Sequence, residues 1–344
     1  MPASTVKIPH HNPLRLLNAE PNWKNELSDC VTSIDELLKK LDLCPTQINI
    51  SHQTATQFAL KVPQSFIARM EKGSPNDPLL KQVLPMAEEL ASPIGYSQDP
   101  LDETDHNPAP GIIHKYRHRL LLIVSPACAI NCRYCFRRHF PYLENRQSKS
   151  QWSKTLDYIS NNKDINEVIF SGGDPLAVND NFLGWLTAQI ANIQHIKRLR
   201  IHTRLPVVIP SRIDRQFLQW ATSTRLRPIV VLHINHANEI NTELKHATQL
   251  LVDAGLKVLN QTVLLKGIND DANTLANLSE RLFECNITPY YLHLLDPVQG
   301  ASHFDVDRNT ALKIYRQLQA IVPGFLLPKL AQEIPGEPSK TLIN

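Results

Sequence analysis

Long hydrophobic runs are missing from this sequence. The longest, such as Leu120 to Val124, fall far short of the roughly 20 apolar residues that a membrane-spanning helix needs, so we expect no membrane span. The N-terminal stretch MPASTVKIPHHNPLRLLNAEPNW has no apolar segment behind a basic start and does not resemble a secretory signal. We therefore expect a cytoplasmic protein.

An excess of charge of one sign is also lacking. The 36 Lys and Arg against 33 Asp and Glu give a formal net charge of +3, too little to indicate a nucleic-acid partner by bulk electrostatics. Three of the six cysteines are scattered, at Cys30, Cys44 and Cys285, which does not make a disulfide framework. Hydrophobic residues at 42% and charged residues at 20% exclude a disordered or fibrous chain.

Short apolar runs rich in β-branched residues alternate with longer amphipathic runs from Arg119 onward. Their starts are mostly about 30 residues apart, roughly the length of one βα unit. Six such units predict a parallel sheet, either doubly wound or curved into a partial barrel, with ligands at the carboxyl ends of its strands. The expected strands are Leu120–Val124, Glu167–Phe170, Arg198–Thr203, Ile229–Ile234, Lys257–Leu264 and Thr288–Leu294, and the expected helices are Trp152–Ile159, Asn181–Ile193, Arg212–Thr222, Thr242–Ala254 and Asn273–Phe283.

The rest of the chain divides around these units. Residues 1–100 contain amphipathic pieces with helical spacing, Trp23 to Leu43 and Val62 to Met70, and are expected to form a mainly helical N-terminal region. Between Asp99 and Gly111 the sequence is acidic and proline-rich, which favours a surface connection. We expect a connection with a basic segment at 101–118, the barrel at 119–310 and a C-terminal segment at 311–344.

A cysteine triplet, Cys128, Cys132 and Cys135, directly follows the first expected strand. Three interpretations are open. The cysteines recur at helical spacing and could be small buried hydrophobes. Structural zinc would need a fourth ligand, for which His139 is the local candidate. An iron–sulfur cluster usually has four thiolate ligands, so three would leave one iron open to a substrate or cofactor.

The spacing Cys-x3-Cys-x2-Cys, with Tyr134 before the last cysteine, resembles the signature of the radical S-adenosylmethionine (SAM) enzymes. The segment Ser171-Gly172-Gly173-Asp174-Pro175 after the second strand resembles the glycine-rich segment of the same enzymes, although alone it would equally be a tight turn. The resemblance implies an α/β fold of the radical SAM type: a partial six-unit (β/α) barrel, with an N-terminal helical region and a short C-terminal extension.

Further segments, over roughly residues 100 to 344, resemble the lysine 2,3-aminomutases. The chain is similar to the short branch of that family, which lacks the C-terminal oligomerisation segment and makes β-lysine for modification of elongation factor P. The matching segments are Lys115 to Arg119, Cys135 to Arg138, Arg204 to Pro210, His233 to Glu239, Asn260 to Leu265, Pro289 to Asp296 and Pro335 to Lys340.

This resemblance implies three cofactors: a 4Fe-4S cluster, SAM and pyridoxal 5′-phosphate (PLP). The cluster ligands would be the cysteine triplet. SAM would lie against Gly172, Gly173 and Asp174 at its methionine end, with His233 and Gln261 contacting it from later strands. Without the resemblance, His233 would more simply be a core histidine.

For PLP, the resemblance implies Lys340 as the lysine that binds the cofactor covalently, and Lys115 and Arg119 as its phosphate site. The longer members of the family have glycines where this chain has Glu337, Pro338 and Ser339. From the residues alone, Lys340 would be one lysine near a chain end, and Lys115 and Arg119 could belong to a solvated charged face.

For the substrate, the resemblance implies that Arg137 holds the lysine carboxylate with its planar fork. It implies Asp296 and Glu333 as the acids that bind the distant ammonium; the longer members have Asp at the second position. An alternative for Asp296 is a turn cap before Pro297.

Taken together, the sequence predicts an isomerase that converts L-α-lysine to (R)-β-lysine, with a reduced flavodoxin- or ferredoxin-like electron donor and with neither nucleic acid nor membrane as a partner. Two alternatives are a radical SAM aminomutase for another amino acid, such as glutamate or arginine, and a non-enzymatic iron–sulfur or zinc protein. Acids at 296 and 333 argue against glutamate.

Overall fold

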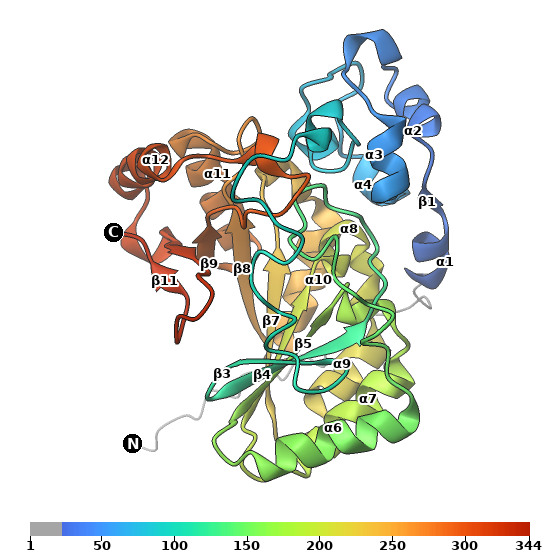
Figure 1. Cartoon of the computed structure of the whole chain (residues 1–344), viewed down its shortest axis with the longest axis vertical. Coiled ribbons are helices and arrows are strands. Elements are labelled where there is room, and N and C mark those ends of the chain that lie inside the picture. The colour runs from blue at the N-terminus through green and yellow to red at the C-terminus, as the bar shows by residue number, and fades with distance from the viewer. Residues whose placement is uncertain (1–22) are drawn as a thin grey trace, which may run out of the picture.

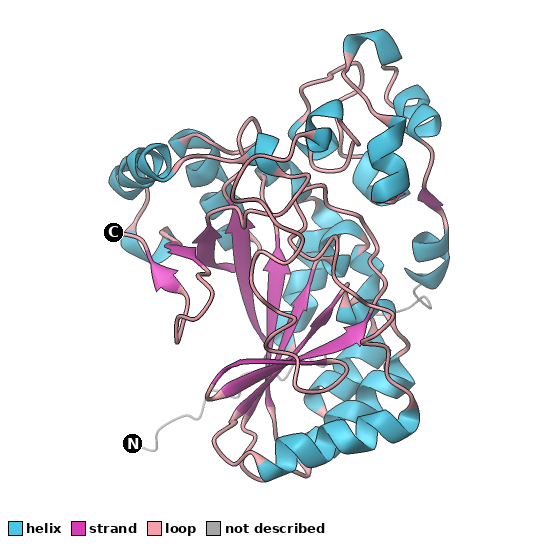
Figure 2. Cartoon of the chain, in the orientation of Figure 1, coloured by secondary structure: helices cyan, strands magenta, loops and turns pink. Residues whose placement is uncertain are grey.

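The central feature is a curved nine-stranded sheet in which seven strands run parallel (Figures 1 and 2). The structure, a computed structural model, describes residues 23–344. The strands are β3 (Ile112–Tyr116), β4 (Arg119–Ser125), β5 (Glu167–Gly172), β6 (Arg198–Thr203), β7 (Arg227–His233), β8 (Lys257–Val263), β9 (Thr288–His293), β10 (Lys329–Gln332) and β11 (Thr341–Leu342). All six predicted strands are confirmed as β4 to β9.

Strand order decides between the two predicted architectures. The order along the sheet is β11-β10-β9-β8-β7-β6-β5-β4-β3, so each parallel strand is added beside the one before it. Right-handed crossovers that always add on the same side put the helices on one face of the sheet, which then curves toward a barrel. The partial barrel is confirmed, and the doubly wound alternative is wrong.

The main helices lie on the outer face and begin at short polar side chains. They are α6 (Lys149–Asn161), α7 (Asp180–Ala191), α9 (Arg215–Thr222), α10 (Thr242–Asp253), α11 (Ala272–Glu284) and α12 (Arg308–Ile321). Each is preceded by a Ser, Asn or Asp whose oxygen accepts a hydrogen bond from a backbone N–H in the first turn. These caps replace hydrogen bonds that a helix start otherwise leaves unmade.

The N-terminal region lies beyond the carboxyl ends of the strands, as a set of short elements (Figure 1). Its elements are α1 (Trp23–Ser28), β1 (Cys30–Val31), α2 (Ile34–Lys40), η2 (Pro45–Gln47), α3 (His52–Gln57), β2 (Val62–Pro63), α4 (Gln64–Ile67), α5 (Pro78–Lys81) and η3 (Ala87–Leu90). The expected helical pieces at 23–43 and 62–70 are therefore wrong in part: β1 interrupts the first piece, and its partner strand β2 occupies the start of the second. Residues 1–22 of the predicted region lie outside the described part, and the predicted boundaries at 100, 118 and 310 stay predictions.

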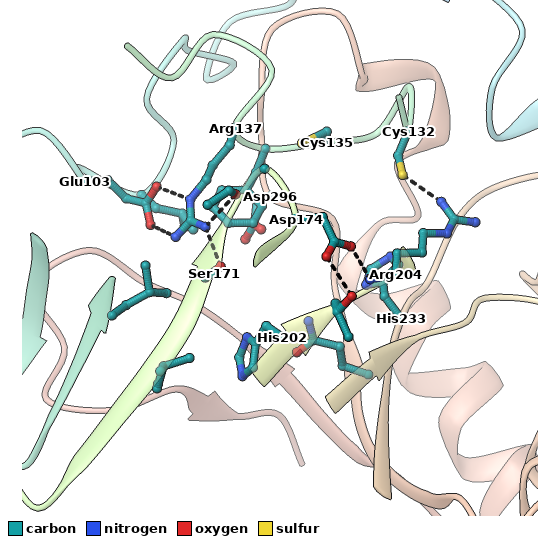
Figure 3. Close-up of a pocket in the computed structure, with 18 of the residues that line it drawn as sticks. Glu103, Cys132, Cys135, Arg137, Ser171, Asp174, His202, Arg204, His233 and Asp296 are labelled. Atoms are coloured by element: carbon teal, nitrogen blue, oxygen red, sulfur yellow. Dashed lines mark hydrogen bonds and ion pairs between the residues drawn. The ribbon is translucent and has the colours of Figure 1, made fainter. Parts of the chain in front are cut away.

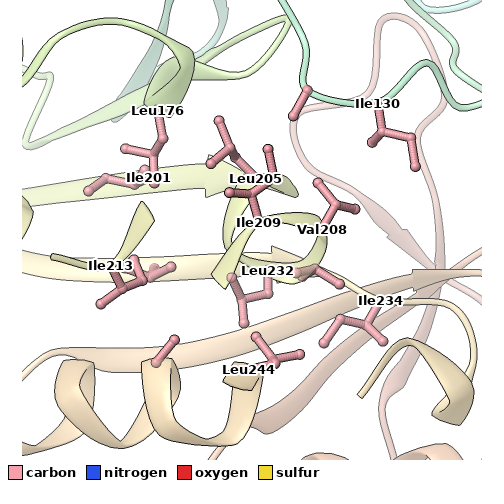
Figure 4. Packing of buried hydrophobic residues seen from close by; sticks show 14 of the residues in the cluster. Ile130, Leu176, Ile201, Leu205, Val208, Ile209, Ile213, Leu232, Ile234 and Leu244 are labelled. Atoms are coloured by element: carbon pink, nitrogen blue, oxygen red, sulfur yellow. The ribbon is translucent and has the colours of Figure 1, made fainter. Parts of the chain in front are cut away.

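The core between the sheet and the helices contains a buried turn after β6. This turn comprises α8 (Leu205–Val208) and Ile209, and it packs against Leu232 and Ile234 of the next βα unit (Figure 4). The remaining short elements are η4 (Pro175–Ala177), η5 (Pro210–Arg212), η6 (Ala237–Glu239), η7 (Ser302–Phe304) and η8 (Gly324–Leu326). The apolar turn fixes the chain immediately after β6, where Arg204 lies.

An ion pair connects the edge strand β3 with the residue that follows β10, the strand next to the opposite edge. Lys115 lies on the edge strand β3, and its Nζ is 3.0 Å from a carboxylate oxygen of Glu333, the residue after β10. Because β3 and β10 are far apart in strand order, the sheet must curve almost fully round for these atoms to meet. Across residues 23–344, no helix is long and apolar enough to span a membrane.

Candidate active site

One cavity of about 520 Å³ occupies the inside of the partial barrel, a volume typical of small-molecule sites. Strands β4 to β10 direct their carboxyl ends and the following loops toward it, so residues far apart in the sequence meet there (Figure 3). Every residue that the sequence predicts for the site lines this cavity: Cys128, Cys132, Cys135, Lys115, Arg119, Arg137, Gly172, Gly173, Asp174, His233, Gln261, Asp296, Glu333 and Lys340.

The three cysteines follow β4 in one loop and interact electrostatically. Burial, followed by the charge of neighbouring cysteine sulfurs, raises the pKa of Cys135 to about 11 and that of Cys128 well above its usual value. Between residues 23 and 344, no three His, Cys, Asp or Glu side chains surround a single point as one metal ion requires. A cluster binds each thiolate through a different iron, so three cysteines around one cavity fit a cluster with an open iron.

The N-terminal region holds the cysteine loop from outside. Arg133, between two of the cysteines, is fully buried and forms a two-bond ion pair with Glu89 at 2.8 and 2.6 Å. Arg138 donates to the same carboxylate at 2.8 Å, and Lys61 donates to the backbone carbonyl of Cys128 at 2.9 Å. The loop geometry therefore depends on residues some 40 to 70 positions earlier in the chain.

Gly172 and Gly173 allow the end of β5 to approach the start of the cysteine loop. Gly172 has a φ of +127°, and a Cβ there would lie 2.3 Å from the carbonyl oxygen of Ser125. A Cβ on Gly173 would lie 2.7 Å from the carbonyl oxygens of Pro126 and Ala127. The glycines therefore place the backbone of β5 against the loop that carries Cys128, with no room for a side chain.

Asp174 uses its carboxylate for hydrogen bonds within the protein, most of them from backbone N–H groups. Its carboxylate, which lies beside Arg204 in Figure 3, accepts hydrogen bonds from Leu176 N, Thr203 Oγ1, Arg204 N and Leu205 N, at 3.0, 2.7, 2.8 and 2.9 Å. Burial raises its pKa, while these donors favour the charged form. Asp174 borders the cavity, but the visible role of its oxygens is to join the ends of β5 and β6; the predicted SAM contact stays a prediction.

His233 and Gln261 enter the cavity from β7 and β8. His233 Nε2 lies 3.1 Å from the hydroxyl of Tyr134, and the two rings stack with centroids 5.7 Å apart. Burial, followed by the charge of Arg204, lowers the pKa of His233 to about 3, so the imidazole is neutral at physiological pH. This position suits a neutral hydrogen-bonding partner for a ligand.

Lys340 and Lys115 share one carboxylate. Glu333 lies 2.6 Å from Lys340 Nζ and 3.0 Å from Lys115 Nζ. Burial opposes ionisation of Glu333, but the two ammonium groups outweigh it and lower its pKa to about 2. The predicted PLP lysine, phosphate ligand and substrate acid are thus adjacent, with Glu333 paired to the other two. The remaining predicted phosphate ligand, Arg119, stacks over the ring of Tyr116 at 4.0 Å.

Arg137 is held in place by Glu103, an acid that the sequence did not predict for the site. Its Nε and Nη2 donate to the two oxygens of Glu103 at 2.7 Å each, and its Nη1 donates to Ser171 Oγ at 2.9 Å. Nη1 also donates to the carbonyl oxygen of Gly172 at 3.4 Å. A guanidinium has five N–H donors, so one hydrogen, on Nη2, is left for another acceptor. The predicted carboxylate contact therefore has this N–H to use, and a second hydrogen bond would have to replace the long contact to Gly172. The pair was absent from the prediction because Glu103 falls in the segment assigned to a surface connection.

Among the acids that line the cavity, Asp296 is the one whose negative charge is least balanced by neighbouring groups. Burial raises its pKa to about 7, and the nearby charge of Lys340 offsets only part of this effect. A cationic ligand would complete the compensation.

Two half-buried histidines of the barrel interior were also missed. His202 and His293 lie two residues after Arg200 and Tyr291 on their strands, so each pair shares the inner face. Burial, followed by neighbouring positive charges, lowers the pKa of both well below the usual value. Within the described residues His202 Nε2 is buried without a hydrogen-bond partner, which fits a polar ligand in the cavity. Strict strand alternation would have been enough to place both rings inside.

Comparison with known proteins agrees with this geometry. Residues 122–278 match the model of the radical SAM superfamily. L-lysine 2,3-aminomutase of Haemophilus influenzae is 51% identical over 327 residues, which cover 95% of this chain and 97% of that protein. The Escherichia coli enzyme of the same name is 50% identical, with 93% and 94% covered. The enzyme of that name from Clostridium subterminale is 31% identical, with 93% and 77% covered. The predicted family is thereby confirmed: the chain belongs to the L-lysine 2,3-aminomutase family of the radical SAM superfamily.

Proposed function

We propose that this protein is an isomerase that moves the amino group of L-lysine from C2 to C3 and forms (R)-β-lysine. The observation that carries the proposal is a single cavity in which a cysteine triplet after β4 faces the same space as Lys340 after β10. Neither an iron–sulfur scaffold nor a zinc protein would need Lys340 and two further acids beside the cysteines.

Three cofactors fit the residues of this cavity. Cys128, Cys132 and Cys135 would hold a 4Fe-4S cluster, with SAM beside it near Gly172, His233 and Gln261, and Lys340 would hold PLP with Lys115 and Arg119 near its phosphate. When bound, the cluster and SAM supply a radical able to take hydrogen from an unactivated carbon, and PLP supplies a π-system for the migrating nitrogen.

The protein's own residues bind and orient the substrate. The remaining N–H of Arg137 Nη2 would donate to the α-carboxylate, with Glu103 holding the plane of the guanidinium. Asp296 would pair with the ε-ammonium and become fully ionised in doing so, because an adjacent cation lowers the pKa of a buried acid.

Glu333 would have a positively charged partner whether Lys340 is free or bound to the cofactor. In the present structure it pairs with both Lys340 and Lys115. If Lys340 is bound to the cofactor, Glu333 would keep Lys115 and be able to accept the substrate ammonium as a second partner. The extra methylene of Glu, relative to the Asp of longer members, increases its reach to these groups.

We further propose that a reduced flavodoxin- or ferredoxin-like protein supplies the electron, and that the β-lysine serves modification of elongation factor P. Both proposals rest on the resemblance to the short branch of the family.

One anaerobic assay tests the reaction. The reconstituted protein is incubated with L-lysine, SAM, PLP and dithionite, and the amino acids are separated and identified. We expect β-lysine, and no rearrangement when glutamate or arginine replaces lysine. Rearrangement of another amino acid without activity on lysine would contradict the proposed substrate, and no SAM cleavage with a complete cluster would contradict the reaction.

A further inference from the structure

Arg204, the first residue after β6, directs its guanidinium at one of the three cysteines. Its Nη1 lies 2.7 Å from Cys132 Sγ (Figure 3) and 2.6 Å from the Tyr134 hydroxyl. Its Nη2 donates to Gln82 Oε1 at 2.7 Å and to Glu239 Oε2 at 2.9 Å. The side chain is 6% exposed, so these contacts form away from bulk water.

The surrounding structure holds this guanidinium in place from both ends. The carboxylate of Asp174 accepts the backbone N–H of Arg204 at 2.8 Å, and the buried turn Leu205–Ile209 anchors the chain that follows (Figure 4). At the far end, Glu239 and Gln82 are buried and hydrogen-bonded to each other at 3.1 Å. The hydrogen bond to sulfur is therefore preorganised.

In the ion pair between Arg204 and Glu239, the guanidinium lies nearer to the sulfur of Cys132 than the carboxylate does. Glu239 contacts Nη2, whereas Cys132 contacts Nη1. Glu239 also accepts the backbone N–H groups of Asn235 and His236 at 2.9 and 3.1 Å, which disperse its charge. At Cys132 the nearer positive charge therefore outweighs the more distant negative one.

We propose that Arg204 raises the reduction potential of the iron–sulfur cluster by donating a hydrogen bond to the Cys132 thiolate. This inference rests on the proposed function, and it assigns Arg204 a positioning role exerted through a cluster ligand. Reduction adds one electron, and no proton, to the cluster from a one-electron donor. Hydrogen bonds to ligand sulfurs and nearby positive charge both favour the state with the additional electron.

The test compares two double variants. Arg204→Gln with Glu239→Gln removes both members of the ion pair, so that no buried charge is left alone. The matched control is Arg212→Gln with Asp180→Asn, a buried pair at 2.7 Å that does not line the cavity. Each protein is reconstituted anaerobically, and its midpoint potential is measured by EPR during titration with dithionite.

We expect a lower midpoint potential in the Arg204/Glu239 variant and no change in the control. Glu239→Gln alone should shift the potential upward, because the charge of Arg204 then has no partner. A midpoint equal to that of the unsubstituted protein would overturn the inference. Iron content is measured first: a chain that binds no iron in its unsubstituted form refutes the proposed function and this inference together, whereas a normal cluster with an unchanged potential refutes only this inference.

A measurement on the unsubstituted protein covers the case in which the variant does not fold. Protein made with guanidino-¹⁵N arginine is reduced, and its cluster is examined by pulsed EPR. A guanidinium nitrogen hydrogen-bonded to a ligand sulfur should give a weak ¹⁵N coupling. A spectrum without any ¹⁵N coupling would show that no arginine donates to the cluster and would overturn the inference.

Discussion

Replacing Asp296 by Asn should stabilise the substrate-free protein at alkaline pH while removing a contact for lysine. Burial raises the pKa of Asp296 to about 7 from the ordinary value of 3.8. Between these two values the folded protein keeps a proton that the unfolded chain has lost. Stability therefore falls as pH rises through this window, and the full penalty is present above pH 7.

The size of the penalty follows from the two pKa values. Each unit corresponds to about 1.4 kcal/mol, so the raised pKa of Asp296 lowers the unfolding free energy by about 2 kcal/mol at pH 5 and by about 4 kcal/mol at pH 8. An amide at this position carries no such cost. The advantage of the variant in unfolding free energy should therefore grow by about 2 to 3 kcal/mol between these pH values.

Urea unfolding at pH 5 and pH 8, without lysine and under anaerobic conditions, measures this difference. Asp157→Asn, at an exposed position on α6, removes the same charge from the surface and is the matched control. If Asp296→Asn and the unsubstituted protein differ by the same unfolding free energy at both pH values, the carboxylate is not held in a desolvated position and the reasoning fails.

The same variant should lose lysine recognition. A substrate ammonium without its acid should cost roughly 2 to 5 kcal/mol in kcat/KM, as for a broken buried charge pair, with cluster and PLP content retained. If Asp296 only caps the turn before Pro297, stability would change by about 1 kcal/mol and KM would stay the same. An unchanged kcat/KM at normal cofactor occupancy would remove Asp296 from the site.

Three further predictions concern the cofactors and the loop that holds them. Alanine at Cys128, Cys132 or Cys135 should abolish the roughly four irons per chain that anaerobic reconstitution yields, whereas Cys285→Ala should not; stoichiometric zinc without iron, after purification from iron-replete cells, would contradict this. Lys340→Ala should remove PLP absorbance while leaving the cluster intact, and borohydride reduction that places the pyridoxyl group on another lysine would refute the assignment. Glu89→Gln should destabilise the fold by about 3 to 5 kcal/mol and lower iron loading, because the two buried guanidinium groups of Arg133 and Arg138 lose their common carboxylate. An unchanged iron content and urea midpoint would show that this carboxylate does not hold the cysteine loop.

Strands and helices of the barrel could be predicted because burial and periodicity coincide there. In the predicted strand Glu167–Phe170, the residues Val168 to Phe170 are apolar on both faces, as a central parallel strand requires, and β5 contains the run. The segment Trp23 to Leu43 also shows helical spacing, yet a strand pair interrupts it at Cys30. That pairing depends on Val62 and Pro63, which a local pattern cannot include.

The site could be predicted only as far as motifs reach. Cys132 and Lys340 stand in recognisable segments, and the structure places both at one cavity. Glu103 and Glu89 belong to segments that lack a pattern of their own, and their roles arise from arginines elsewhere in the chain. Such ion pairs form between distant segments, so their partners become visible only in three dimensions.

The ion pair between Lys115 and Glu333 has a mechanical consequence for the barrel. Hydrogen bonds between neighbouring strands hold the sheet together from β3 to β11, whereas a charged contact connects the edge strand β3 with the residue after β10. Glu333 divides its charge between Lys115 and Lys340, so neutralising Lys340 would leave Lys115 a larger share and tighten this contact. The curvature of the sheet would then respond to the charge state of a single lysine, and hydrogen exchange at β3 and β10 would report the response.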